Sequence, residues 1–334
     1  MAGLVCAARA RELGSRPRLV EKGTRAGGSM LLSSCVVWRH REWEDFRAEC
    51  PGGDEALQRL IWERLDDALA WLVSLGAEPV WEDTPNRRTT GMRFDPRALT
   101  QLLARDVELE TPLPDDVDEQ VVLATGGWGK ALAEQSGLLL RANEWSDGAG
   151  LAYATARGAD FVGSAEFYGR AMPAPPARIR EEDFVSLSQL YGTWARVYTD
   201  EGREITPSSV AWHESDLAQK IGPRAWYVLD DEGLVHARER VEAARAAGGT
   251  VVEPRELPFA TPPDARVAVH VAAAVTHTLG GLRVDARARV LDESGAPIDG
   301  LYAAGVDVGR VATGGYASGL AQALVLGLAA AEAL

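Results

Sequence analysis

The sequence predicts an α/β fold, and three features of the chain carry that prediction. Residues 121–124 form a continuous apolar run without polar alternation, which is typical of a strand covered on both faces. Residues 18–21 form a second short apolar run that ends in an acid, as parallel strands often do. Apolar residues recur at helical spacing over residues 54–75, which predicts an amphipathic helix between the two strands.

The elements in the first third of the chain follow from local signals. Residues 2–14 are rich in small apolar side chains and predict a helix. Residues 24–34 predict a loop, because they contain two adjacent glycines and several hydroxyl side chains. A further helix is expected over residues 95–104, where Asp95 is an N-cap and Pro96 occupies the first turn.

The remaining elements of the main domain are marked by turns. Thr125-Gly126-Gly127 directly follows the apolar run at residues 121–124 and predicts a tight turn at the end of that strand. Asp147 and Gly148 open a helix that is expected to reach residue 157. Later strands are expected at residues 265–271, 282–284 and 301–305, and a buried helix from residue 319 to the end.

Two proline clusters bound a region of different composition. One lies at residues 173–176 and the other at residues 258–263. Between them the chain is richer in charged and aromatic side chains, which predicts an inserted domain. The expected division is a first part of the main domain at residues 1–170, the inserted domain at residues 171–264 and the second part at residues 265–334.

The composition excludes several classes of partner. The 334 residues carry a formal net charge of -14, whereas binding of nucleic acid calls for a basic face. The same acidity argues against docking on an anionic membrane, and the apolar stretch at residues 319–334 is too short to span a bilayer. Without a secretory segment, the cytoplasm is the expected location. The 3 cysteines and 5 scattered histidines predict neither a disulfide scaffold nor a metal site.

Gly3 and Glu21 are the first residues in the chain that match a cofactor-binding motif. A helix that starts at a glycine, followed about 20 residues later by a strand that ends in an acid, matches the second half of a dinucleotide-binding fold. The helix N-terminus offers N–H groups to a pyrophosphate, and Glu21 would accept hydrogen bonds from ribose hydroxyls. The alternative is a small-residue helix and a surface acid, because the opening strand and the first two glycines of the motif are absent.

Further segments follow in a recognisable order. They are Lys22 with Gly27-Gly28-Ser29, the turn at Thr125-Gly126, Asp147, the strand end at Gly305 with Asp307, and the glycine-rich run from Gly314 to Gly319. Together they resemble the FAD-dependent oxidoreductases related to fumarate reductase, succinate dehydrogenase flavoprotein and 3-ketosteroid dehydrogenase (FAD-binding type 2). The strongest stretch is residues 268–285, which contains Thr276-His277-Thr278-Leu279-Gly280-Gly281.

This resemblance implies a Rossmann-like FAD-binding domain split by an inserted α+β capping domain, with the first strand missing from an N-terminally truncated chain. It implies FAD held without a covalent bond, because His40 lies beyond the Gly28-Ser29 loop. Gly319 and Leu320 would present N–H groups to the flavin N1/O2 edge. The residues implied to bind FAD are Gly3, Glu21, Lys22, Gly27, Gly28, Ser29, Thr125, Gly126, Asp147, Gly305, Asp307, Gly319 and Leu320.

The resemblance also implies catalytic residues. His277 matches the family histidine that contacts the substrate, although a lone histidine is also commonly a satisfied buried residue. His213 is a candidate for proton transfer, and Tyr316 and Arg310 complete the set. Ala211 and Gly314 stand where the family has two arginines. Since two arginines clamp a dicarboxylate, their loss argues against succinate or fumarate as the substrate.

The expected function is hydride transfer between flavin N5 and a C–C bond next to a carbonyl of a small organic substrate, in either direction. The sequence names neither the electron donor or acceptor nor the oligomeric state. One alternative is a truncated or degenerate homologue that binds a partner without catalysis. A weaker alternative is a nicotinamide-dependent dehydrogenase.

Overall fold

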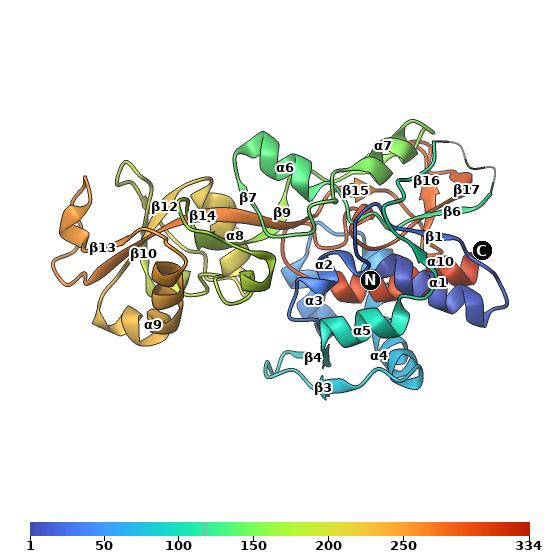
Figure 1. Ribbon diagram of the computed structural model, residues 1–334, viewed down its shortest axis with the longest axis horizontal. Helices are drawn as coiled ribbons and strands as arrows, with labels where there is room; N and C mark the ends of the chain where they lie inside the picture. Colours follow the sequence, from blue (N-terminus) through green and yellow to red (C-terminus); the bar gives the residue numbers. More distant parts are fainter. Residues whose placement is uncertain (116, 118) are drawn as a thin grey trace. The chain divides into compact units, whose positions relative to one another are not determined.

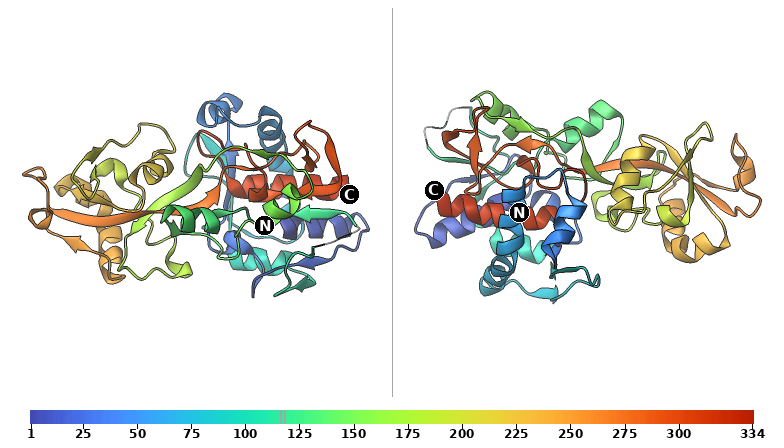
Figure 2. Two further views of the ribbon diagram at one scale, coloured as in Figure 1. Left: turned by 90° about the horizontal axis from the view of Figure 1, so that it is seen from above. Right: turned by 180° about the vertical axis from the view of Figure 1, so that it is seen from behind.

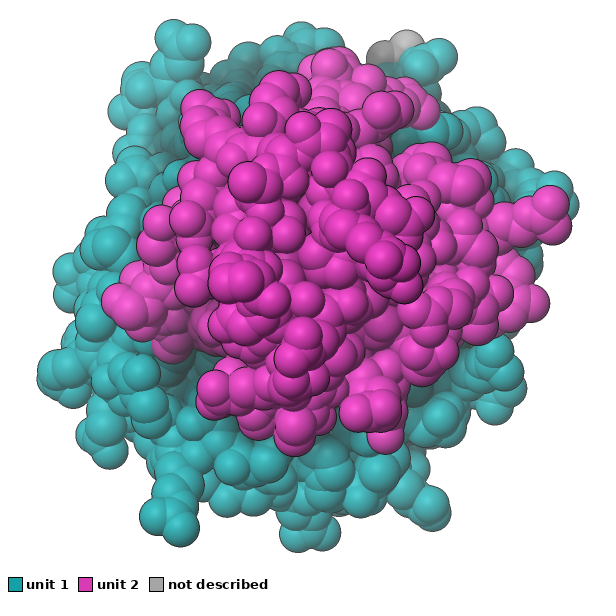
Figure 3. Space-filling view, turned by 90° about the vertical axis from the view of Figure 1, so that its left-hand side faces the viewer, with its two compact units in different colours: residues 1–130, 143–166, 277–334 teal, residues 131–142, 167–276 magenta. Residues whose placement is uncertain are grey.

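The chain folds into two compact units, and a computed structural model describes residues 1–115, 117 and 119–334 of it (Figure 1). Unit 1 comprises residues 1–130, 143–166 and 277–334, and unit 2 comprises residues 131–142 and 167–276. Figure 3 distinguishes the two by colour. Unit 2 includes residues 131–142, 167–170 and 265–276, which were predicted to belong to the main domain.

Two helices form the centre of unit 1. Helix α10 (Gly319–Ala333) is buried along most of its length, and α1 (Ala2–Glu12) lies against it in every view (Figures 1 and 2). The two backbones approach closely at Gly327, where a Cβ would lie 2.8 Å from the carbonyl oxygen of Ala2. The small residues of both helices therefore allow this packing.

In the described residues of unit 1, the strands form four small sheets. They are the parallel pair β1 (Leu19–Val20) and β5 (Val107–Glu108), the sheet β16 (Arg289–Leu291), β17 (Pro297–Ala303) and β6 (Val121–Leu123), the antiparallel sheet β2 (Val36–His40), β4 (Thr89–Phe94) and β3 (Pro79–Trp81), and the pair β15 (Gly281–Leu282) and β8 (Phe161–Val162). Because β17 and β6 are parallel, with Ala303 opposite Leu123, their carboxyl ends meet at one edge.

The other helices of unit 1 begin at residues that suit helix starts. Asp54 caps α4, and its carboxylate accepts a hydrogen bond from Leu57 N–H at 3.1 Å. Asp95 caps α5 in the same way through Ala98 N–H at 2.8 Å. These helices are α2 (Gly28–Leu31), α3 (Trp43–Glu49), α4 (Glu55–Ser74), α5 (Pro96–Leu103), α7 (Ala149–Thr155) and the 3₁₀ turn η4 (Gly305–Asp307).

Unit 2 is built around the long strand β14 (Val267–Thr278), whose last two residues belong to unit 1. Its sheet runs β11 (Glu204–Ile205), β10 (Arg196–Tyr198), β12 (Ala225–Leu229), β14 and β13 (Val251–Val252), and β7 (Leu139–Leu140) and β9 (Phe167–Pro173) also pair with β14. The remaining elements are α6 (Gly129–Ser136), which starts in unit 1, α8 (His213–Ile221), α9 (Asp231–Ala246), η1 (Glu181–Asp183), η2 (Gly192–Trp194) and η3 (Pro254–Glu256).

The mixed α/β class predicted from the sequence is confirmed, as are its main helices. One strand is longer than predicted: β14 runs to Thr278 instead of ending at residue 271, so His277 lies on a strand. The antiparallel sheet of β2, β4 and β3 was not predicted, because residues 36–40 show no apolar alternation. Of the helices in the described residues, none is both long and apolar enough to cross a membrane.

Candidate cofactor and substrate site

The turn after β6 is fixed by a buried acid. Asp307 accepts hydrogen bonds from the Thr125 hydroxyl at 2.7 Å, from Gly126 N–H at 3.0 Å and from Gly127 N–H at 3.3 Å. Burial raises the pKa of Asp307, against the opposing effect of these donors. Three of the residues predicted to bind the cofactor thus meet at the sheet edge. The carboxylate of Asp307 acts there by shaping the turn.

The N-terminal end of α1 lies at the same edge. A Cβ on Gly3 would be 3.2 Å from the Cβ of Ala124, the residue that follows β6. Gly305 has a positive φ of 70°, and a Cβ on it would be 3.0 Å from the Cβ of Ala2. Gly3, on α1, therefore contacts the residue after β6, and Gly305, near the other end of the sequence, contacts the start of α1.

The loop after β1 meets a segment that is distant in sequence. Lys22 forms an ion pair with Asp147, and Ser29 Oγ accepts a hydrogen bond from Asn143 N–H at 3.0 Å. Burial would raise the pKa of Asp147, but the hydrogen bond and charge of Lys22 outweigh it, so this pKa is lowered. The predicted residues Lys22 and Asp147 are therefore brought together, and Ser29 contacts the segment that leads to Asp147.

The glycines in the loop after β1 leave part of its backbone uncovered by side chains. Glu21 accepts a hydrogen bond from Gly23 N–H at 2.8 Å, which closes the turn after β1. Gly27 and Gly28 have positive φ values of 109° and 53°, which suit glycine. The nearest atom to a Cβ on Gly28 would be Asn143 Nδ2 at 3.7 Å, so the backbone stays accessible there.

The predicted histidine, His277 on β14, lies against the start of α10. A Cβ on Gly319 would lie 3.2 Å from His277 Nε2, so the imidazole rests against the first turn of the helix. Ser318 caps the helix by accepting a hydrogen bond from Ala321 N–H at 3.2 Å, and Leu320 is partly buried beside it. Burial lowers the pKa of His277, and its Nδ1 lies 3.2 Å from Thr278 O. The Nε2 atom of the imidazole therefore faces the start of the helix.

Two aromatic side chains flank this helix start. The ring of Tyr316 lies 5.4 Å from that of Trp38, and Trp38 N–H donates to Ser318 Oγ at 3.5 Å. Trp38 was missed from the sequence, because only the pairing of β2 with β4 brings it to α10. An aromatic residue in a five-residue strand carries no signal of its own.

The last two predicted residues, Arg310 and His213, make other contacts. Arg310 is exposed and has a positive φ of 59°, and its backbone N–H donates to Leu279 O at 3.1 Å. His213 belongs to unit 2, where it is the first residue of α8 and its Nδ1 lies 3.1 Å from Val210 O. The roles predicted for both remain predictions.

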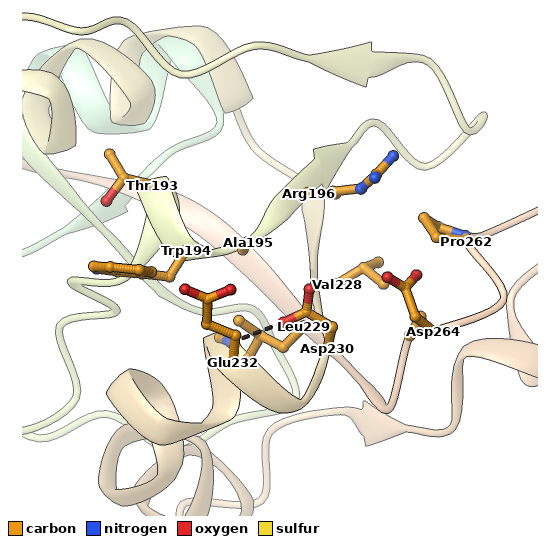
Figure 4. Close-up of a pocket in the computed structure, with 12 residues that line it drawn as sticks. Thr193, Trp194, Ala195, Arg196, Val228, Leu229, Asp230, Glu232, Pro262 and Asp264 are labelled. Atoms are coloured by element: carbon orange, nitrogen blue, oxygen red, sulfur yellow. Dashed lines mark hydrogen bonds between the residues drawn. The ribbon is translucent and has the colours of Figure 1, made fainter.

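Unit 2 also has an open pocket beside the start of α9 (Figure 4). Its lining includes the side chains of Trp194, Asp230, Glu232 and Asp264, with Arg196 at one edge. None of the residues predicted to bind cofactor or substrate lines it. Three carboxylates would repel the pyrophosphate of a dinucleotide, so we assign the cofactor elsewhere.

Comparison with protein families identifies the family of the chain. The model of the FAD binding domain family matches residues 116–320, which is more than half of the chain. The chain belongs to this family. As a member of this family of FAD-dependent oxidoreductases, it takes FAD as its cofactor.

The relatives of this FAD-binding chain are distant. An NADH:acrylate oxidoreductase of Vibrio harveyi is 34% identical over 108 residues, and the match covers 31% of this chain and 10% of that protein. The open conformation of a flavocytochrome c3 fumarate reductase superposes with a TM-score of 0.76 at 20% identity, covering 99% of this chain and 76% of that one. A 3-ketosteroid Δ1-dehydrogenase of Sterolibacterium denitrificans gives 0.69 at 15% identity, covering 99% and 97%. These structures establish a common fold.

The residues of unit 1 fit FAD. The open backbone at Gly28 and the cation of Lys22 suit a pyrophosphate, since one ammonium donor on Asp147 leaves two others. Glu21 suits a ribose, because its second carboxylate oxygen is available beside the one that closes the turn. The start of α10 suits the electron-rich edge of a flavin.

Proposed function

We propose that this chain is a flavoenzyme that reduces, or forms, a C–C double bond next to a carbonyl in a small organic molecule. The bound FAD would exchange a hydride with the substrate carbon through its N5 atom. Unit 2 would be the capping domain of the family, inserted in an FAD-binding unit 1. The NADH:acrylate oxidoreductase among the relatives supports an unsaturated carbonyl compound as the substrate class.

The observation that carries the proposal is the contact of His277 with Gly319 at the start of α10. The N–H groups at the start of the helix form an electropositive corner without a formal charge, and His277 turns its Nε2 toward this corner while its Nδ1 lies on Thr278 O. Such a corner would hold the carbonyl oxygen of a substrate as negative charge develops on it. Tyr316 and Trp38 would add an apolar wall to the same corner.

The remaining roles follow from what each side chain can do. His213 would supply or accept the proton at the second substrate carbon, as a histidine can do near neutral pH. Arg310 is exposed and would attract an anionic substrate. The noncovalent binding of FAD is part of the proposal, and no electron partner is assigned.

The test uses the purified chain loaded with FAD. Its reduced form is mixed anaerobically with acrylate, fumarate or 1,4-androstadiene-3,17-dione, and the return of flavin absorbance is followed. We expect rapid reoxidation by at least one of the three. If none reacts faster than buffer alone while FAD stays bound, the proposal fails and the chain is a flavin-binding protein without this activity.

A variant tests the role of His277. His277→Ala is expected to keep FAD and to lower the reoxidation rate about 100-fold, the usual scale for a lost acid–base or polarising group. His236→Ala serves as the control, because His236 is exposed on α9 and stacks on Trp194 at 3.7 Å. Full turnover in His277→Ala would remove that residue from the mechanism.

A further inference from the structure

Helix α4 of unit 1 carries a polar side chain on its buried face. Gln58 precedes Ile61 and Leu65 at helical spacing, and its exposed fraction is 0%. A leucine would suit this apolar stripe, since burial of an amide is unfavourable unless its polar atoms have partners. The partners of Gln58 therefore show what a glutamine does at this position.

Three groups satisfy the amide of Gln58. Its Oε1 accepts a hydrogen bond from the guanidinium of Arg47. Its Nε2 donates to the carbonyl oxygens of Val311 at 2.7 Å and of Cys50 at 2.9 Å. Because Cys50 directly follows α3 and Val311 lies near the end of the chain, one side chain joins two segments that are distant in sequence.

The distant segment is the loop at residues 310–318, which leads into α10. It lies with its backbone directly on the connection between α3 and α4, where Asp54 N–H donates to Arg310 O at 2.5 Å. A Cβ on Gly53 would lie 2.0 Å from Gln58 Nε2 and 2.5 Å from the carbonyl oxygen that this atom binds. Only glycine at this position leaves room for the amide.

The same loop carries residues that the proposed function places around the substrate. Arg310 and Tyr316 belong to it, and Ser318 at its end caps α10. A backbone hydrogen bond joins Tyr316 to Cys50, whose carbonyl oxygen accepts the second hydrogen bond of Gln58. The amide of Gln58 therefore contacts the start of the loop directly and reaches Tyr316 through Cys50.

We propose that Gln58 is a positioning residue that holds the loop at residues 310–318, so that Tyr316 keeps its place beside the start of α10. This inference rests on the proposed function, in which Tyr316 and Trp38 form an apolar wall for the substrate. Loss of the amide would leave the carbonyl oxygen of Val311 without a donor among the residues that the structure describes. The loop would then move toward water, and the wall would move with it.

Limited digestion of the FAD-loaded chain with trypsin measures whether the loop is held. Arg310 is exposed, whereas Val311 after it is bound by Gln58, so cleavage between the two requires the loop to leave α4. We expect Gln58→Met to speed the release of residues 311–334, identified by mass spectrometry, about tenfold. Gln189→Met in unit 2 is the matched control, because its amide is also fully buried and donates to Leu187 O at 2.5 Å. It should leave this cleavage unchanged.

Kinetics separate positioning from a loss of stability. The reoxidation rate of the reduced, FAD-loaded chain is measured against the concentration of the compound that reacts in the test above. We expect Gln58→Met to raise the half-saturating concentration about tenfold and to change the limiting rate less than about twofold, because the wall contacts substrate and the flavin stays in place. A merely destabilised protein would lose active molecules and keep its half-saturating concentration.

Each outcome decides between the two claims. An unchanged cleavage rate in Gln58→Met would overturn the hold on the loop. Faster cleavage with an unchanged half-saturating concentration would overturn the positioning role. If no compound turns over, the proposed function fails and the positioning role with it, while the digestion still tests the hold on the loop.

A second variant serves if Gln58→Met does not fold. Arg47 is partly exposed and donates to Gln58 Oε1 and to Gly53 O at 3.1 Å. Arg47→Met should leave the amide of Gln58 less firmly oriented and speed cleavage after Arg310 about threefold. An unchanged rate in this variant would count against the hold on the loop.

Discussion

The polar groups of units 1 and 2 differ in kind: those of unit 1 belong largely to the backbone, and those of unit 2 belong to buried side chains. In unit 1 the site consists largely of backbone: the turn at Gly126, the open loop at Gly28 and the start of α10 at Gly319. In unit 2 it consists of buried side chains, chiefly Glu214 and Tyr227. A site of backbone N–H groups suits a large anionic cofactor that must be held without side chains in the way. A buried carboxyl and hydroxyl suit a group that exchanges protons.

The largest change in stability is expected from the substitution of a glycine in unit 1. Gly315 lies so close to Glu49 that a Cβ would overlap its carbonyl oxygen. Gly315→Ala should therefore lower the free energy of unfolding by more than about 4 kcal/mol, because the backbone on both sides must move. Urea unfolding followed by circular dichroism measures this.

The control for that variant is a glycine in open space. Gly158 has a φ of 86°, and a Cβ added to it would have no neighbouring atom within 4 Å. Gly158→Ala should cost about 1 kcal/mol, the penalty for a left-handed alanine alone. If the two variants were equally stable, the backbone of unit 1 would not be closely packed at Gly315.

A smaller effect is expected at the ion pair between Lys22 and Asp147. Lys22→Ala should weaken FAD binding about tenfold, because a charged hydrogen bond to phosphate is lost, and isothermal titration calorimetry measures it. The matched control is Lys220→Ala in unit 2, which breaks a similar pair with Asp216 and should leave FAD binding unchanged. Equal affinities for wild type and Lys22→Ala would place the pyrophosphate elsewhere.

The ion pair between Lys22 and Asp147 also predicts that the stability of the folded chain depends on pH. The pKa of Asp147 is lowered in the folded chain, so the pair contributes stability above the unfolded value of 3.8. That contribution is lost as the pH falls through the folded pKa. Thermal unfolding of Lys22→Ala and wild type should therefore differ by less than about 1 kcal/mol at neutral pH and converge in acid.

The smallest effect is expected in unit 2. Tyr227→Phe removes a buried hydroxyl that has no partner among the described residues, so stability should change by less than about 1 kcal/mol, in either direction. Tyr191→Phe is the comparison, because its hydroxyl donates to Gln189 Oε1 at 2.7 Å and its loss should cost about 1–3 kcal/mol. Equal costs would mean that Tyr227 also has a partner, such as a buried water.

The contrast between the units also explains what could be predicted from the sequence. Glycines such as Gly27 and Gly319 are visible in a sequence, because a positive φ or a close contact demands that residue type. The family resemblance placed both glycines in the predicted FAD-binding set. The helix caps Asp95 and Asp54 gave similarly local signals for α5 and α4, although only Asp95 was identified.

Side chains brought together by tertiary packing left no such signal. Trp38 reaches α10 through strand pairing, and Glu214 meets Tyr227 across α8 and β12. Any residue type can stand at such positions, and no spacing links them. Asp307 was predicted to bind the cofactor, but only the structure gave its partners in the turn at Thr125.

FAD binding by the purified chain is the decisive measurement for the cofactor site assigned to unit 1. The protein is incubated with FAD, passed through a desalting column, and its absorbance is recorded before and after denaturation. We predict an equimolar amount of FAD that is released intact, together with a tenfold weaker affinity in Lys22→Ala. A colourless protein that retains no FAD, or a flavin that stays attached to the denatured chain, would contradict it.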